Sequence, residues 1–348
     1  MKREGPEEKS KIAQHAIKWA AILGLLFFAC AKNRDFMLDA MRCVKDTTPA
    51  CIGIIFLLGN AYIVLAGLIN SIMTRTGDVH VPAAGGIYCE YMCAFYRLAT
   101  LGSGGGIAQV YYYHTKGIPA SRGLGMAVCQ YTFHKIAIGI YGVIGFLVML
   151  FMEPRLVSAY RWFLLAGIFV IAAICAFLFV IMVSKKFSDV TFRIGYKLAG
   201  KKKGLAKKLA SARRSVKSMQ DQSRRIWSRK GMFGKLLVIN LVKQTCWYLI
   251  PGVILSKSVG EDIFVSTFLM AVVNMLGCVM VAPSGIGTLE FCFALLFGKI
   301  IGKAEVIAAT LILYRAFTWL VPFLLGLPCA LFFKKPTNGD SQSASRSV

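Results

Sequence analysis

The chain has 348 residues, of which 57% are hydrophobic, and its mean hydropathy is +0.62. These values are typical of polytopic membrane proteins and exclude an ordinary soluble globular domain. The formal net charge is +25 at pH 7, and seventeen Lys or Arg residues between Lys185 and Lys235 outnumber the two acids there, Asp189 and Asp221. Because basic loops mark the cytoplasmic side of a membrane protein, we place segment 185–235 in the cytoplasm.

The eleven cysteines lie mostly in apolar segments and show no paired Cys-x-x-Cys spacing. This pattern is typical of small buried hydrophobic residues and argues against a disulfide framework or a zinc site. The four histidines are scattered, without a His-Glu-x-x-His motif or a Cys/His cluster. We therefore expect neither a metal centre nor a cofactor.

Six apolar runs have roughly the length of a transmembrane helix, about twenty residues, although the first is short. They cover residues 17–31, 49–72, 121–151, 161–183, 236–256 and 304–333. No secretory cleavage site is visible after the first run, so we expect a retained span. Two further apolar segments, 81–113 and 263–300, are interrupted by glycine-rich breaks. The sequence thus predicts an all-α polytopic membrane protein with about six full spans plus two re-entrant helical hairpins.

The distribution of basic residues predicts the topology of these segments. With 185–235 inside, the loop 114–122 also lies in the cytoplasm. The basic N-terminus lies inside only if 81–113 returns to the face from which it enters. The lysine pair after the last span lies inside only if 263–300 does the same. We therefore predict hairpins that enter from opposite faces of a bacterial cytoplasmic membrane, with both termini cytoplasmic.

The break in the second interrupted segment is the string Pro283-Ser-Gly-Ile-Gly-Thr-Leu-Glu290. Proline and closely spaced glycines break a helix, and the freed backbone groups are tolerated at bilayer depth only beside protein or water. The string aligns with Ser103-Gly-Gly-Gly-Ile-Ala-Gln109 at an offset of 181 residues, and the same offset relates Arg315 to His134. Opposed hairpins in two halves of one chain indicate an inverted-repeat transporter.

Ionisable residues at bilayer depth are the candidates for function. Besides His134 they comprise four cations and two anions: Arg97, Lys135, Lys243, Arg315, Glu90 and Glu290. The surplus of positive charge requires an anionic partner, and a phosphate headgroup meets that need. Arginine binds phosphate in a bidentate manner, and N–H groups at glycine-rich helix starts add donors. The predicted headgroup-binding residues are Arg97, Lys135, Arg315, Ser103, Gly104, Gly106, Gln109, Ser284, Gly285, Gly287, Glu290 and Glu90.

Several of these residues also have a purely structural interpretation. Glu90 and Arg97 share a helix face and form either an internal ion pair or a substrate contact. Lys135 and Lys243 have side chains long enough to reach the interface instead of a cavity. Glu290 caps the turn, pairs with the arginine of the last span, or couples transport to protons, and the sequence leaves these three roles open.

The basic segment carries apolar residues at helical spacing, namely Leu205, Leu209, Ala212, Val216 and Met219. This pattern predicts an amphipathic helix lying on the anionic inner leaflet. Binding of tRNA or another nucleic acid is disfavoured, because no base-stacking aromatic platform accompanies the charges. We interpret residues 1–335 as one integral membrane domain and 336–348 as a disordered tail.

The string Pro283–Glu290, together with Leu313-Tyr-Arg315 and the apolar proline-containing run that follows, resembles the transmembrane region of the lysylphosphatidylglycerol synthase family. Gly104-Gly-Gly-Ile-Ala-Gln-Val-Tyr-Tyr112 and Lys116-Gly-Ile-Pro-Ala-Ser-Arg122 are similar to that family's motif in the first half. The resemblance extends over most of the chain. Members of the family have a flippase-like membrane region, and many also carry a soluble domain that transfers lysine from lysyl-tRNA to phosphatidylglycerol.

The resemblance implies a membrane lipid translocase for an anionic or aminoacylated phospholipid, such as lysyl-phosphatidylglycerol, linked to resistance to cationic antimicrobial peptides. Membrane phospholipids are the expected partners. We expect no lysyl-transferring domain, because the sequence stops soon after the last span. One alternative is phosphatidylglycerol lysyltransferase activity together with a separately encoded synthase. A second alternative is a transporter of small molecules or ions.

Overall fold

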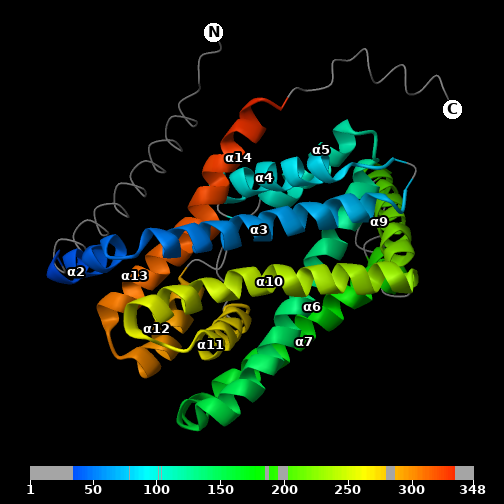
Figure 1. The fold of residues 1–348 in the computed structure, drawn as a ribbon. Helices are drawn as coiled ribbons and strands as arrows, with labels where there is room; N and C mark the ends of the chain where they lie inside the picture. Colours follow the sequence, from blue (N-terminus) through cyan, green and yellow to red (C-terminus); the bar gives the residue numbers. More distant parts are fainter. Residues whose placement is uncertain are drawn as a thin grey trace, which may run out of the picture.

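The computed structural model describes residues 34–77, 79–100, 102, 104–184, 188–194, 203–279 and 287–333, and within these ranges it contains helices and no strands (Figure 1). The predicted all-α class is therefore confirmed. The helices with defined bounds, in chain order, are α2 (Arg34–Lys45), α3 (Pro49–Thr74), α4 (Ala83–Ala99), α5 (Gly104–Thr115), α6 (Ala120–Met152), α7 (Pro154–Val183), α9 (Lys203–Ser228), α10 (Lys230–Val259), α11 (Ile263–Leu276), α12 (Thr288–Ile301), α13 (Ala304–Arg315), the π-helical turn η2 (Ala316–Leu320) and α14 (Val321–Leu331).

Five of the described helical runs are long and apolar enough to cross a membrane: α3, α6, α7, α10 and the continuous run from α13 through α14. They correspond to five of the predicted spans, and the remaining one, 17–31, lies outside the described residues. Large apolar side chains cover their outer surface, among them Phe151, Trp162 and Phe169, which are between 74% and 81% exposed. Hydrocarbon accommodates such a surface, whereas water does not. The chain is a multi-pass membrane protein.

The interrupted segment 81–113 forms two short packed helices, α4 and α5, which we call hairpin 1. Between them, the hydroxyl of Thr100 donates to the carbonyl of Tyr96 (2.7 Å) and accepts from the N–H of Gly104 (2.6 Å). Gly102 has a φ of 107°, a left-handed conformation that side chains disfavour. The glycine thus turns the chain, while Thr100 satisfies backbone groups at the end of one helix and the start of the next.

The second interrupted segment, 263–300, forms α11 and α12, which also pack on each other and which we call hairpin 2. Asp262 caps α11 by accepting a hydrogen bond from the N–H of Phe264 at 2.7 Å. The helix α12 begins after Gly287, whose φ of 87° again favours glycine. Residues 280–286, between the two helices, lie outside the described part of the chain.

The helices form two repeats of the same order: a long helix, a hairpin and a second long helix. The first repeat is α3, hairpin 1 and α6, and the second is α10, hairpin 2 and the run from α13 to α14. Their contacts are reciprocal. The helix α4 packs on α14, its counterpart α11 packs on α6, and the counterparts α3 and α10 pack on each other. Each hairpin contributes to its own cluster of buried apolar side chains.

The two repeats run in opposite directions (Figure 1). The residues that follow α3 and the first turn of α6 both contact α9, through Thr76 with Gln222 and Ser121 with Ser218. The helix α10 starts directly after α9 and ends beside hairpin 2, at the other end of the molecule. Hairpin 1 therefore opens toward the α9 end and hairpin 2 toward the opposite end, which is the geometry of an inverted repeat.

The offset of 181 residues between the two aligned strings recurs in the helix contacts. Gly145 in α6 lies so close to α11 that an added Cβ atom would be 2.9 Å from Cγ2 of Val272. At the same offset, Gly326 in α14 and Tyr91 in α4 make the counterpart contact, where a Cβ atom would be 2.2 Å from the Tyr91 carbonyl oxygen. Small residues at both crossings let the backbones approach closely. The internal repeat is thus present in sequence and in packing.

One pair of counterpart residues touches directly. Tyr62 in α3 and Lys243 in α10 stand at the same offset, and the Lys243 ammonium lies 5.0 Å from the centre of the Tyr62 ring. In a two-fold arrangement, equivalent positions meet each other only near the symmetry axis. This contact therefore marks the centre of the repeat, and Lys243 is only 2% exposed there.

The helix α9 connects the two repeats and packs against α6, α7 and α10. The buried side chains of its second half include Met219, Ser223 and Ile226. At the end of α7, the carbonyl oxygen of Val183 accepts a hydrogen bond of 2.5 Å from Arg224. The apolar face of this half of α9 therefore covers protein. Of the predicted stripe, Met219 belongs to this buried face and Ala212 is exposed, so a contact between the rest of the stripe and the inner leaflet stays a prediction. An amphipathic pattern alone does not distinguish the two surfaces.

The glycine at the α4–α14 crossing provides a test of the packing. We expect Gly326→Ala to destabilise the protein by roughly 1–3 kcal/mol, because the added methyl group displaces the backbone of α4. The measurement is thermal unfolding of the purified protein in detergent micelles. The matched control is Gly53→Ala, in α3, where an added Cβ atom meets nothing within 4 Å. Equal melting temperatures for the two variants would contradict the close crossing.

Candidate functional site

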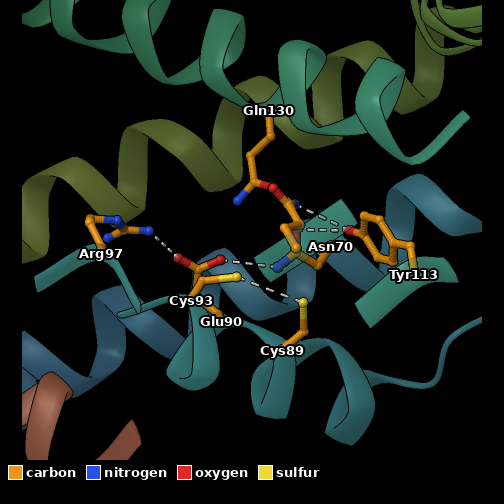
Figure 2. Close-up of polar contacts among 8 residues, drawn as sticks. Asn70, Cys89, Glu90, Cys93, Arg97, Tyr113 and Gln130 are labelled. Atoms are coloured by element: carbon orange, nitrogen blue, oxygen red, sulfur yellow. Dashed lines mark hydrogen bonds and ion pairs between the residues drawn. The ribbon is translucent and has the colours of Figure 1, made fainter. Parts of the chain in front are cut away.

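The carboxylate of Glu90 is the centre of a buried polar cluster in the first repeat (Figure 2). Arg97, two turns further along α4, donates to Oε1 of Glu90 at 2.9 Å, and Asn70 of α3 donates to Oε2 at 3.0 Å. The Glu90 residue is only 3% exposed. Both carboxylate oxygens are thus engaged, and the ion pair that the seven-residue spacing suggested is present.

Asn70 links this ion pair to α5, the second helix of hairpin 1 (Figure 2). Its side-chain oxygen accepts from Gln109 at 2.8 Å and from the hydroxyl of Tyr113 at 3.1 Å, and both donors lie on α5. The amide nitrogen of Gln109 also donates to Gln130 of α6 at 2.5 Å. One network of side chains therefore ties α3, α4, α5 and α6 together at the buried face of hairpin 1.

Glu290 makes the corresponding contacts in hairpin 2. Its Oε2 accepts from the N–H of Gly287 at 2.8 Å, and its Oε1 accepts from Nε of Arg315 at 2.6 Å. Nη2 of Arg315 lies 2.6 Å from the same oxygen but makes no well-directed hydrogen bond. The guanidinium also lies 4.4 Å from the centre of the Trp319 ring. Glu290 thus both caps the turn and pairs with Arg315.

Two lysines supply the remaining positive charge. The ammonium of Lys135 lies 3.2 Å from Sγ of Cys278, at the end of α11, and 5.3 Å from the centre of the Tyr131 ring. Lys243 lies over Tyr62 and interacts electrostatically with the Glu90–Arg97 pair. Among the described residues, neither lysine has a carboxylate within ion-pair distance. The predicted surplus of cations is therefore present among the described residues.

Further polar groups on α10 surround Lys243. Asn240, Gln244 and Trp247 follow at the spacing of one helix face, together with Lys243 itself. Among the described residues, the side-chain oxygens of Asn240 and Gln244 and the indole nitrogen of Trp247 are buried without a hydrogen-bond partner. Unpartnered buried polar atoms are rare in folded proteins and indicate a place where water or a polar ligand binds. The stripe thus presents one cation, two acceptors and one donor at the centre of the repeat.

The other predicted site residues fall into three groups. The N–H of Gly104 is used by Thr100, so it is not free for a ligand. Gly106 is surrounded by open space, since an added Cβ atom would meet nothing within 4 Å. Ser103, Ser284 and Gly285 lie outside the described residues.

The structure adds residues that sequence reasoning missed. Asn70, Tyr113 and Gln130 connect the predicted residues of hairpin 1. For Lys243, the sequence does not decide between an interface and a cavity, and it is absent from the predicted headgroup-binding residues. For the stripe on α10, the signal was present in the sequence as polar residues at positions 240, 243, 244 and 247 of an apolar span. For Asn70, the signal was an amide within such a span, which also contains Asn60.

A comparison with protein families identifies the family of this chain. The family described as the lysylphosphatidylglycerol synthase TM region matches residues 16–326, nearly the whole chain. The chain belongs to this family. The match covers both hairpins and every predicted site residue, in agreement with the resemblance of the motifs. A search of curated proteins finds no match to the chain.

The Glu290–Arg315 pair can be tested by a double-mutant cycle. Glu290→Gln and Arg315→Gln each leave one half-buried charge without its partner, so each should destabilise the protein by roughly 1–3 kcal/mol. The double variant should lose less than the sum of the two single variants. The measurement is thermal unfolding in detergent micelles, and strictly additive losses would show that the two side chains do not interact.

Proposed function

We propose that this member of the family is a lipid translocase that moves an anionic or aminoacylated phospholipid headgroup, such as that of lysyl-phosphatidylglycerol, between the leaflets. The observation that carries the proposal is Lys243, a cation buried at the centre of an inverted repeat without a carboxylate partner. A buried charge is costly unless it is paired, and inverted-repeat transporters bind their substrates at the repeat interface.

The surroundings of Lys243 fit the chemistry of such a headgroup. The phosphate would bind the ammonium of Lys243, with further donors from Arg97 of hairpin 1 and from Arg315 at the end of α13. The unpartnered oxygens of Asn240 and Gln244 are acceptors for the hydroxyl or ammonium groups of the headgroup. The acyl chains would stay in the bilayer, since the outer surfaces of the spans are apolar.

The hairpins supply the alternating gates on this proposal. Hairpin 1 opens toward the α9 end and hairpin 2 toward the opposite end, so each controls access to the centre from one face (Figure 1). Each is fastened to a long helix by a short polar contact, Gln109 with Gln130 and Glu290 with Arg315. These contacts are the ones that must open when a face opens.

The translocation assay tests the role of Lys243. Proteoliposomes containing a fluorescent anionic phospholipid report transfer between leaflets through a membrane-impermeant quencher. We expect Lys243→Gln to slow transfer by roughly tenfold or more, the equivalent of one charge-assisted contact, and Lys243→Arg to retain part of the rate. The control is Lys257→Gln, at the exposed end of the same helix. Unchanged transfer in Lys243→Gln would refute the proposal.

An experiment in cells separates transport from synthesis. Lipid extracts of cells with and without the gene should contain the same amount of lysyl lipid but differ in its distribution between leaflets. New lysyl lipid in the extracts would instead support lysyltransferase activity. Flux of a soluble solute into sealed vesicles, independent of lipid type, would support a small-molecule transporter.

The entry of the hairpins from opposite faces is tested by cysteine mapping. In a cysteine-free background, we expect Gly102→Cys to react with an impermeant thiol reagent from one side of the membrane and Ser284→Cys from the other. The physical reason is the antiparallel arrangement of the two repeats. Labelling of both positions from the same side would contradict inverted hairpins.

A further inference from the structure

A basic cavity lies away from the central site, between the start of α6 and the helix α9. Its volume is about 250 Å³, and its charged lining residues are Arg122, Arg214, Lys217, Arg225 and Asp221. Four cations and one carboxylate thus line one small space. The surplus of positive charge makes an anion the expected occupant.

The walls of this cavity are held in place by hydrogen bonds. Ser218 of α9 bonds to Ser121 in the first turn of α6 at 3.1 Å, and the buried Gln222 donates to Thr76 at 2.6 Å. Gln220 donates to the carbonyl oxygen of Ile181 on α7 at 2.8 Å. Because α9 is fixed on three neighbouring elements, the backbone positions that carry its cations are set before a ligand arrives, which lowers the entropic cost of binding.

The chemistry of the lining favours a phosphate group. Three of the four cations are arginines, whose planar guanidinium groups bind phosphate oxygens in a bidentate manner. The first turn of α6 adds the positive end of its dipole, and no side chain caps it. A phosphate carries one or two negative charges, in keeping with the net positive charge of the lining.

A second cavity extends the first one. It has a volume of about 190 Å³, shares Arg122 and Gln222 with the basic cavity, and includes the apolar residues Val79, Ile118 and Met126. The basic lining of the first cavity and the partly apolar lining of the second therefore meet at Arg122 and Gln222. This arrangement suits a phosphate that carries an apolar substituent, as in a phospholipid.

We propose that the basic cavity between α6 and α9 is a second anion site that binds a phosphate group, separate from the central translocation site. A phosphate held there contacts both α6 of the first repeat and α9, which leads into α10 of the second. Its binding therefore ties the connection between the repeats to the first repeat. The site stands independently of the proposed translocase activity, because it rests on the cavity and its charges alone.

Binding measurements with matched variants test this site. The full chain in phosphatidylcholine nanodiscs is titrated by calorimetry with a short-chain phosphatidate and, separately, with inorganic phosphate. We expect Arg214→Gln to weaken phosphatidate binding roughly tenfold, as the loss of one charge-assisted contact predicts. Asp221→Asn should strengthen it, since the only carboxylate in the lining disappears.

The control is Arg213→Gln, which removes the same charge from the adjacent position of α9. Arg213 pairs with Asp189 on the surface at 2.8 Å and does not line the cavity. If Arg213→Gln and Arg214→Gln weaken binding equally, the basic segment attracts anions only as a charged surface, and the proposal is overturned. Absence of saturable binding in the unmodified protein overturns it as well.

The two titrants distinguish the source of the phosphate. Inorganic phosphate that binds and competes with phosphatidate, with the same dependence on Arg214, identifies a site for the phosphate group itself. Binding of phosphatidate alone identifies a lipid headgroup site that needs the apolar end of the cavity. Both outcomes support the proposal, and thermal unfolding of the variants verifies that each one is folded.

Discussion

The contact between Lys243 and Tyr62 is the constraint on which the rest of the structure depends. It joins equivalent positions of α3 and α10, so the two repeats pack around a buried cation. The Tyr62 ring is itself stacked on Trp247 at 3.5 Å, and a π-face stabilises an ammonium group in a desolvated place. This interaction offsets only part of the cost of burial. On the proposed function, an anionic ligand at the centre of the fold offsets the remainder.

The two hairpins are held to the neighbouring helices by different kinds of contact. In hairpin 1, Gln109 is held through neutral amide hydrogen bonds, whereas at the equivalent position in hairpin 2 Glu290 is held by a guanidinium. Glycines at both breaks provide the turns that a bent chain needs. The repeat is thus symmetric in backbone and asymmetric in charge. The contact that holds the second hairpin is an ion pair, whereas the contact that holds the first is a neutral hydrogen bond.

Hydropathy and glycine placement predicted five spans that the structure describes, the two breaks and the offset of the repeat, because these properties are local in the sequence. The pairing of Glu290 with Arg315 was also among the predicted roles. The function of Asn70 was not predictable, since it depends on which helices meet. The burial of Met219 and Ile226 was missed for a similar reason: an amphipathic face shows that a helix has a covered side, but protein and lipid cover it equally well.

The different contacts of the two hairpins affect the relative energies of the two open states of the proposed translocase. If both hairpins were held by identical contacts, the states open to either face would have similar energies, and a ligand at the centre would favour neither. On the proposed function, a phosphate at the centre would compete with Glu290 for Arg315. The amide network of hairpin 1 offers no such exchange. An anionic headgroup would therefore loosen hairpin 2 selectively, and the ligand would bias which face opens.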